Sequence, residues 1–571
     1  MIWKKSLIII LIISLLMTSC GQVDIPNTSV DSSNEIEELT PVEGGEIIVP
    51  LTNFNTLNPL LTTNLYYYYF SKLIYEGLFD FDDNLNVIPK LAKDYTILNG
   101  GRTVSIELRD GIKWHDGEDF TAEDVAFTID VIKYAKRESI YGSVIEENLG
   151  LGQAVNFNSV INTKIINNRA IEINFDKPYL NNLEILTFPI IPKHHFIAKG
   201  SNAIVKALEI DDYIPIGTGP YKFDSYEKNK TIKLSRNTDY WNGSPFIQQV
   251  IGKVLDDEKL ILTAFETGQI NMATTLGVDW DKYKQNSRIK VLEFISPNHE
   301  FLAFNYNNPL LSGELGLAIR KAIYYGINRQ DIIHKVYLGH GTQIDIPLHP
   351  DSYLISDKAF SYGFNKEKAI EILEEAGFKD LDDDGILEGE DGKKLKLRLL
   401  TNPNNSYRRL VSDLIKEHLK DIGMEIILDF DTKYVKDYDG EEQEALWQEF
   451  ITRLNRGDYD IVLMGWQSSI IPNLFPYFHS SMIASGKNVI KFQDQELDQI
   501  LTNTLINQSR DLKPDLYESL QEYMVENIPY VGLYFINKGL LVDTKIKGDL
   551  NPNFNNIYNG IENCFVKEKN D

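Results

Sequence analysis

One stretch constrains the fold of this chain more than any other: Val104 to Lys133, VSIELRDGIKWHDGEDFTAEDVAFTIDVIK. Its first residues alternate apolar and polar, the period of a half-buried strand. Asp110-Gly111 then favours a tight turn, because glycine tolerates positive φ. Thr121 is placed to cap a helix whose apolar stripe is Val125, Ile129 and Ile132. The stretch therefore predicts a strand, turns around Trp114, and a capped helix.

The wording of this stretch is also specific. It resembles the signature LRxGxxWxDGxxxxAxDV of the family 5 extracellular solute-binding proteins, the oligopeptide- and dipeptide-binding receptors of ABC importers. Nine positions match: Leu108, Arg109, Gly111, Trp114, Asp116, Gly117, Ala122, Asp124 and Val125. The resemblance implies an α/β, two-lobed periplasmic-binding-protein-like fold (type II, or cluster C) of three domains, with a ligand cleft between the lobes.

Further segments resemble the family in the family's order. They are TNFNTLNP (residues 52–59), PIGTGPYKF (215–223), AFETGQIN (264–271), YDIVLMGW (459–466) and NIPYVGLYF (527–535). The apolar, β-like residues 289–305 correspond by resemblance to the first crossing between the lobes, and 527–535 to the return. The residues themselves also predict helices beginning after the caps Asn328 and Asn365 and within 406–423.

Length and charge bound the function. A chain of 571 residues is long enough for two or three domains. Its net charge of −26 makes it a poor ligand for a phosphate backbone, so no nucleic-acid partner is expected. Its 43% hydrophobic content is ordinary for a globular protein.

The N-terminus predicts targeting. Two lysines precede the apolar run 7–16, which is too short to span a bilayer, and small residues lead to Cys20. MTSC at 17–20 resembles a bacterial lipobox, which implies an acylated Cys20 and a protein anchored on the extracellular face of the membrane. The alternative is an ordinary cleaved signal. Residues 21–43 are polar and acidic, as in a flexible tether.

The resemblance gives the predicted domain limits. Residues 1–20 form the signal peptide and 21–43 the tether. Lobe I spans 44–297 with an inserted subdomain at about 64–206, lobe II spans 298–532, and 533–571 return to lobe I.

The ligand-binding residues are predicted from the two segments that border the family's cleft. They are Asn53, Phe54, Gly465, Trp466, Gln467, Ser468 and Ser469. Peptide receptors normally carry an aspartate after the Gly-Trp pair that binds the ligand's α-amine, and here serines stand instead. The tyrosine run 66–69 has two interpretations: an aromatic ligand platform, or the start of a helix that packs on the core, which we favour.

The segment DLDDDGILEGED predicts a possible calcium site. Asp380, Asp382 and Asp384 stand at loop positions 1, 3 and 5, Gly385 at 6 and Asp391 at 12. Position 12 usually holds a bidentate glutamate. The alternative is a solvated acidic turn. No other cofactor is expected.

The implied protein is a monomeric receptor that captures peptides and delivers them to an ABC permease and its ATPase. A related alternative is the same role for a nickel chelate, an opine or a sugar, and a chaperone or signal receptor on this fold is a further option. A secreted hydrolase using His194-His195 or His340 is a distant alternative, because no catalytic motif and no metal-ligand spacing accompanies these histidines. We expect no enzymatic activity.

Overall fold

The structure is a computed structural model that describes residues 40–150, 157–197, 202–211, 213–276, 280–430 and 440–567. The described residues from Pro41 onward belong to one compact unit. The predicted signal peptide, Cys20 and the tether up to residue 39 lie outside the described residues. Among the described helices, none is both long enough and apolar enough to cross a bilayer.

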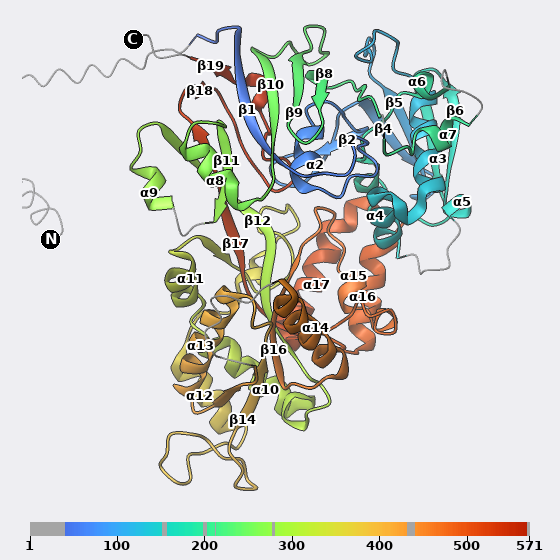
Figure 1. The fold of residues 1–571 in the computed structure, drawn as a ribbon. Helices are drawn as coiled ribbons and strands as arrows, with labels where there is room; N and C mark the ends of the chain where they lie inside the picture. The colour runs from blue at the N-terminus through green and yellow to red at the C-terminus, as the bar shows by residue number, and fades with distance from the viewer. Residues whose placement is uncertain are drawn as a thin grey trace, which may run out of the picture. The chain divides into compact units, whose positions relative to one another are not determined.

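The first sheet joins the start of the fold to strands much later in the chain (Figure 1). Its order is β1 (Gly44–Thr52), β10 (Ile247–Leu255), β9 (Thr231–Arg236) and β8 (Tyr221–Glu227), with β1 and β10 parallel. Ile47, Val49 and Leu51 of β1 alternate into the core, as in a strand with one buried face. β1 is an edge strand of this sheet.

The chain between β1 and β8 forms a second, antiparallel sheet with short helices. The sheet order is β4 (Ala92–Leu98), β5 (Thr103–Leu108), β7 (Ala170–Phe175) and β6 (Ile161–Asn167). Its other elements are α2 (Leu65–Ser71), β2 (Phe79–Phe81), β3 (Val87–Pro89), α3 (Ala122–Ala135), η1 (Lys136–Glu138), α4 (Ile140–Asn148), α5 (Phe157–Val160), η2 (Glu184–Leu186), α6 (Lys193–Ile197) and α7 (Ala203–Lys206).

The signature stretch folds as predicted. β5 is followed by turns, and α3 begins after Thr121, whose hydroxyl accepts a hydrogen bond from the Glu123 amide at 3.3 Å. Asp124 accepts from the Thr121 amide at 2.9 Å and from the indole of buried Trp114 at 3.4 Å. The motif is therefore a capping box fixed to the core by its tryptophan.

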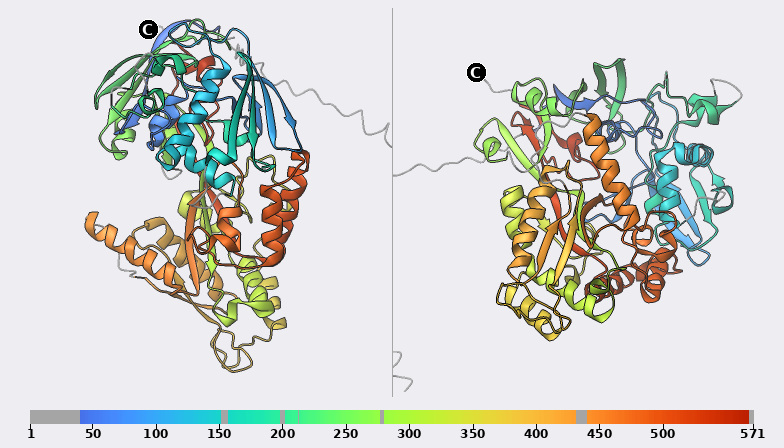
Figure 2. Two further views of the ribbon diagram at one scale, coloured as in Figure 1. Left: turned by 90° about the vertical axis from the view of Figure 1, so that its right-hand side faces the viewer. Right: turned by 60° about the horizontal axis from the view of Figure 1, so that its bottom comes forward.

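Two long antiparallel strands organise the remaining fold: β12 (Ile289–Phe304) and β17 (Val531–Asp543). Their sheet has the order β11 (Met272–Leu276), β17, β12, β16 (Ile461–Gln467), β14 (Lys396–Leu400) and β15 (Glu425–Leu428), with β13 (Gly341–Gln343) on β17. Phe294 and Leu541 pack in one core, whereas Leu302 and Leu533 pack in another. The two strands thus run from the first core to the second, and Figure 2 shows the ribbon from two further sides.

The pairing of β12 with β17 is interrupted between Ile295 and His299. Pro297 lies in this interval and has no amide hydrogen to donate to a ladder. The Ser296 hydroxyl instead donates to the carbonyl of Ile536 at 2.6 Å. The crossing therefore has a local irregularity midway along otherwise continuous strands.

Helices pack around the half of this sheet that lies in the second core. The predicted caps Asn328 and Asn365 are confirmed, because each side chain accepts an amide hydrogen bond at the start of its helix. These helices are α10 (Gly313–Gly326), α11 (Arg329–Tyr337), α12 (Lys366–Glu375), α13 (Ser406–Lys420), α14 (Gly440–Arg456), α15 (Phe475–Phe478), α16 (Gln495–Leu505) and α17 (Lys513–Asn527). The remaining short elements are α8 (Lys259–Glu266), α9 (Trp280–Lys284), η4 (Pro309–Leu311), η5 (Asp357–Phe360), η6 (Ser480–Met482), η7 (Arg510–Leu512), β18 (Ile546–Lys547), η8 (Ile561–Asn563) and β19 (Phe565–Val566).

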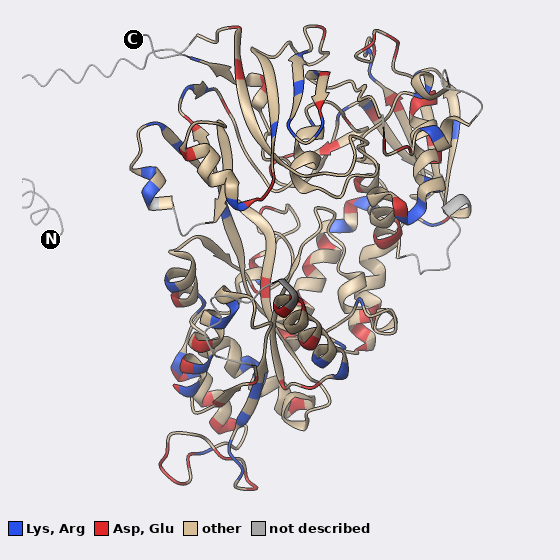
Figure 3. Ribbon diagram, viewed as in Figure 1, with Lys and Arg blue, Asp and Glu red and all other residues tan. Residues whose placement is uncertain are grey.

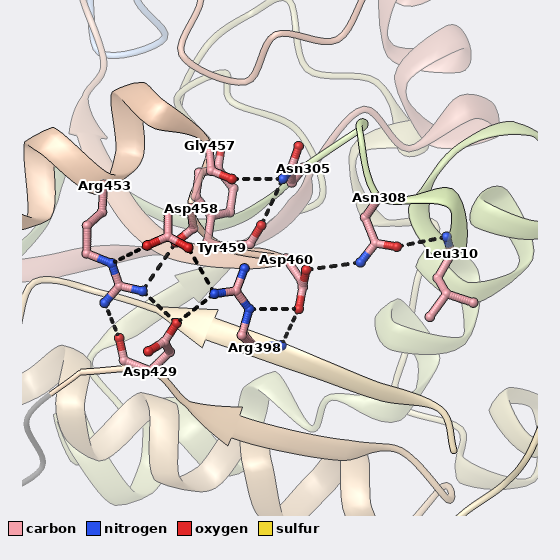
Figure 4. A network of polar contacts seen from close by, with 10 residues as sticks. All are labelled: Asn305, Asn308, Leu310, Arg398, Asp429, Arg453, Gly457, Asp458, Tyr459 and Asp460. Carbon is pink, nitrogen blue, oxygen red and sulfur yellow. Dashed lines mark hydrogen bonds and ion pairs between the residues drawn. The ribbon is translucent and has the colours of Figure 1, made fainter. Parts of the chain in front are cut away.

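A network of charged side chains fixes the beginning of β16 (Figure 4). Arg398 of β14 binds Asp458 at 2.9 Å and Asp429 at 3.3 Å, and Arg453 of α14 binds Asp429 at 2.5 Å. Asp460 accepts from the Asn308 amide group at 3.0 Å. These contacts hold in place the residues from which β16, the strand that ends at Gln467, begins.

Candidate functional site

A cavity lies beside the middle of β12 and β17, where the two paired strands pass from one core to the other. We call this place the strand crossing. The cavity holds about 200 Å³ of space open to water. Its wall comes from α2, the start of α8, β11, the irregular part of β12, the end of β16, β17 and the C-terminal segment. The lining residues that the site argument uses are Tyr66, Tyr68, Glu258, Asn298, Gln467, Ser468 and Lys538.

The tyrosine run contributes to both the core and the cavity. Tyr67 is fully buried, and its hydroxyl donates to the Leu57 carbonyl at 2.6 Å. Tyr66, Tyr68 and Tyr69 line the cavity, and Tyr66 donates to Glu258 at 2.9 Å. The predicted helix that packs on the core is present, and three of its four tyrosines also form a cavity wall.

The opposite wall is the end of β16. A Cβ on Gly465 would lie 2.6 Å from the His299 carbonyl oxygen and 2.5 Å from Glu300 Oε1, so only glycine lets β16 approach β12 this closely. Trp466 packs 4.2 Å from Phe301 and 4.9 Å from Tyr477, measured between ring centroids. The aromatic cluster holds the strand end in place.

Five of the predicted ligand-binding residues, Gly465 to Ser469, lie at this strand end. Gln467 and Ser468 line the cavity, and the Ser468 amide donates to the Pro297 carbonyl at 2.8 Å. Trp466 and Ser469 line a smaller adjoining pocket with Ser468 and His349. β14 pairs only with Ile461 and Val462, so the edge of β16 beyond them has no strand partner among the described residues.

The two predicted residues of lobe I lie elsewhere. The Asn53 carbonyl accepts from the Asn64 side chain at 3.0 Å. Phe54 stacks on Tyr67 at 4.9 Å and approaches Tyr226 at 5.7 Å. Neither belongs to the described lining of the cavity. Their role as ligand-binding residues stays a prediction, as does that of the β16 residues.

Several lining residues were missed in the sequence. Glu258 and Lys538 are the charged residues of the described lining, and Thr274, Phe554 and Asn555 complete the wall. Burial lowers the pKa of Lys538, while the nearby Glu258 carboxylate opposes that shift. No local pattern marks these residues, because distant strand pairings bring them together.

The acidic loop has the turn that its sequence predicts. Gly385 has φ +84°, and its amide donates to Asp380 at 2.9 Å. Carboxylate oxygens of Asp380, Asp382 and Asp384 lie within 4.8 Å of one another, whereas Asp391 binds Lys393 at 2.7 Å. Lys394 binds both Asp384 and Asp382, which places a cation against the cluster. Figure 3 shows red acidic and blue basic stretches in the loop at the bottom of the view. Whether calcium binds here stays a prediction.

The histidines considered for a hydrolase have structural surroundings. His194 binds Asp116 at 2.8 Å, and the ring of His340 packs against Trp280 in a tilted arrangement with ring centroids 3.7 Å apart. Within the described ranges, the acidic loop is the one place where three potential metal ligands meet.

Hydrophobic cores on either side of a pair of long connecting strands, with a cavity of aromatic, apolar and polar side chains beside those strands, define a two-lobed binding protein. The chain belongs to the bacterial extracellular solute-binding proteins, family 5, whose middle region matches residues 86–488. The family and fold predictions are therefore confirmed. The domain limits stay a prediction.

Individual relatives cover nearly the whole chain. The oligopeptide-binding protein AppA of Bacillus subtilis (strain 168) is 27% identical over 545 residues, covering 95% of this chain and 94% of AppA. The structure of that AppA with a nonapeptide has a TM-score of 0.61 at 26% identity, covering 93% of this chain and 100% of AppA. The structure of the ABC transporter substrate-binding protein CtaP of Listeria monocytogenes has a TM-score of 0.73 at 22% identity. The match covers 92% of this chain and 100% of CtaP.

Proposed function

We propose that this protein captures peptides in the cavity at the strand crossing and delivers them to an ABC permease and its ATPase. The observation that carries the proposal is the similarity along 95% of the chain to an oligopeptide-binding protein. The unpaired edge of β16 supports an extended ligand, because peptides add to strand edges through main-chain hydrogen bonds with little sequence preference. Binding without catalysis is the whole of the proposed role.

A thermal-shift screen tests the class of ligand. We expect a pool of di- to decapeptides to raise the melting temperature, since a ligand at about 100 times its Kd stabilises a protein by about 2.7 kcal/mol. Nickel-histidine, sugars and opines are the comparison ligands. If one of these ligands raises the melting temperature and no peptide does, the protein is a solute receptor but the proposed peptide ligand is wrong.

We further propose that Cys20 carries a lipid that anchors a monomeric receptor on the extracellular face of the membrane. The other cysteine, Cys564, is buried, so it supplies no accessible alternative thiol. Two or three acyl chains anchor a protein far more firmly than one. We expect Cys20→Ala to accumulate as unprocessed precursor, which immunoblotting of cell fractions detects. Normal processing and membrane retention of the variant would exclude the lipid.

Calcium binding at Asp380, Asp382, Asp384 and Asp391 is a separate proposal, supported by the three clustered carboxylates. We expect weak binding, with a Kd on the order of 10⁻⁴ to 10⁻³ M, because position 12 lacks the long bidentate glutamate. Calorimetric titration of the wild type measures this affinity.

Two variants give the calcium titration its controls. Asp382→Asn should weaken the binding because it removes a charged ligand. Lys394→Met should strengthen it, since the Lys394 ammonium occupies the carboxylates that calcium needs. The absence of heat at millimolar calcium in both the wild type and Lys394→Met would decide for a solvated acidic turn.

A further inference from the structure

Polar groups in the cavity wall fall into two sets. Tyr66 and Asn555 already bind neighbouring residues, as do Thr274 and Ser296. In contrast, the Ser468 hydroxyl is buried and has no hydrogen-bond partner among the described residues. Buried polar groups are rarely left without hydrogen bonds, so such a group in a cavity wall indicates the place of a ligand or water.

Lys538 is the cation of this wall. It lies on β17, opposite Phe294 of β12 and Leu276 of β11, and its side chain is partly buried. Its ammonium has no hydrogen bond to another described residue and no ion pair within 4.0 Å. A partly desolvated ammonium without a partner is costly, which makes a charged acceptor on the ligand favourable.

Glu258 supplies the opposing charge. It lies just before α8, is exposed, and already accepts the Tyr66 hydroxyl. Its carboxylate raises the pKa of Lys538 against the effect of burial. Glu258 therefore favours a protonated Lys538 without forming a close pair with it.

We propose that Lys538 binds a carboxylate of the ligand and makes the cavity selective for it. The Ser468 hydroxyl lies in the same wall and can donate to that group. This inference rests on the proposed peptide function. It assigns the electrostatic contact that holds the peptide to Lys538 of β17. The carboxylate belongs either to the peptide's C-terminus or to an acidic side chain, and these sources are separable.

Three pentapeptide pools with free N-termini separate the sources. The first pool has free C-termini and no acidic residues, the second has amidated C-termini and no acidic residues, and the third has amidated C-termini and one glutamate. We expect the wild type to bind the first or third pool at least about tenfold more tightly than the second, as a charge-assisted hydrogen bond implies.

Variants then assign the preference to one residue. Lys538→Met should lose the preference and bind the preferred pool about as weakly as it binds the second pool. Lys538→Arg keeps the charge and should retain the preference, and the melting temperatures without peptide check that both variants fold. Equal wild-type affinity for all pools, or equal losses for all pools in Lys538→Met, would overturn the carboxylate site but leave peptide capture. No binding of any pool would overturn both.

Discussion

Glu184→Gln should lower the free energy of unfolding by about 3–5 kcal/mol, the usual cost of breaking a buried ion pair. The Glu184 carboxylate is 1% exposed and binds Arg510 at 2.5 Å and Lys513 at 2.6 Å. Although burial opposes ionisation, the two cations hold the pKa of Glu184 at about 2. Glutamine keeps the shape and removes the charge, so two cations stay buried without a counter-charge.

Urea unfolding of the wild type and the variant measures this loss. The matched control is Glu147→Gln, because Glu147 of α4 forms an ion pair with Lys487 at 2.7 Å in which both side chains are exposed. We expect the control to change stability by less than about 1 kcal/mol. Equal stability of Glu184→Gln and the wild type would show that the charges of Glu184, Arg510 and Lys513 contribute nothing to the free energy of unfolding beyond their hydrogen bonds.

The second large effect is a loss of stability in mild acid that depends on His299. This side chain is fully buried, and the ring of Phe535 stacks on it at 4.7 Å. Neither ring nitrogen has a hydrogen-bond partner in the part of the chain that the structure describes. Burial lowers the pKa of His299 to about 3. The folded state therefore excludes a proton that the unfolded state binds below about pH 6.5.

The sign follows from that difference in bound protons. The contribution of neutral His299 is complete above about pH 6.5 and is lost as the pH falls toward 3, at about 1.4 kcal/mol per pH unit. His299→Phe should therefore show a shallower decline between pH 6.5 and 4.5 in urea titrations. Glu184 does not add to the pH dependence between pH 6.5 and 4.5. Because its folded pKa is low, its contribution to the free energy of unfolding falls only below about pH 4.5.

The exposed His334 provides the control for this experiment. His334→Gln should keep the wild-type pH dependence. An equally steep decline in His299→Phe would mean that other groups, such as His115 and His349 with pKa values lowered by burial to about 4, account for the acid effect.

Local chemistry made much of the fold predictable. The cap at Thr121, the caps Asn328 and Asn365, and the alternation in β5 all depend on neighbouring residues, which a sequence displays directly. The crossing strand β12 was also predicted, through its long apolar pattern and its resemblance to the family.

The cavity was only partly predictable. Gln467 and Ser468 follow a recognisable Gly-Trp pair, whereas Glu258 and Lys538 meet through the pairing of β17 with β11 and β12, which no short segment encodes. Phe54 was predicted as a ligand-binding residue, which stays a prediction; in the structure its ring stacks on Tyr67. Its neighbours in sequence gave no indication of that packing partner, which lies in a separate helix.

Photo-crosslinking tests the central claim most directly. A peptide pool that carries a benzophenone side chain is bound, irradiated and mapped by mass spectrometry of the labelled protein. Capture at the strand crossing predicts labels on Tyr66, Tyr68 and Gln467, and competition by unlabelled peptides should remove them. Labels confined to the separate groove between α10 and α12, lined by Leu315, Tyr325 and Ile372, would contradict the proposed site.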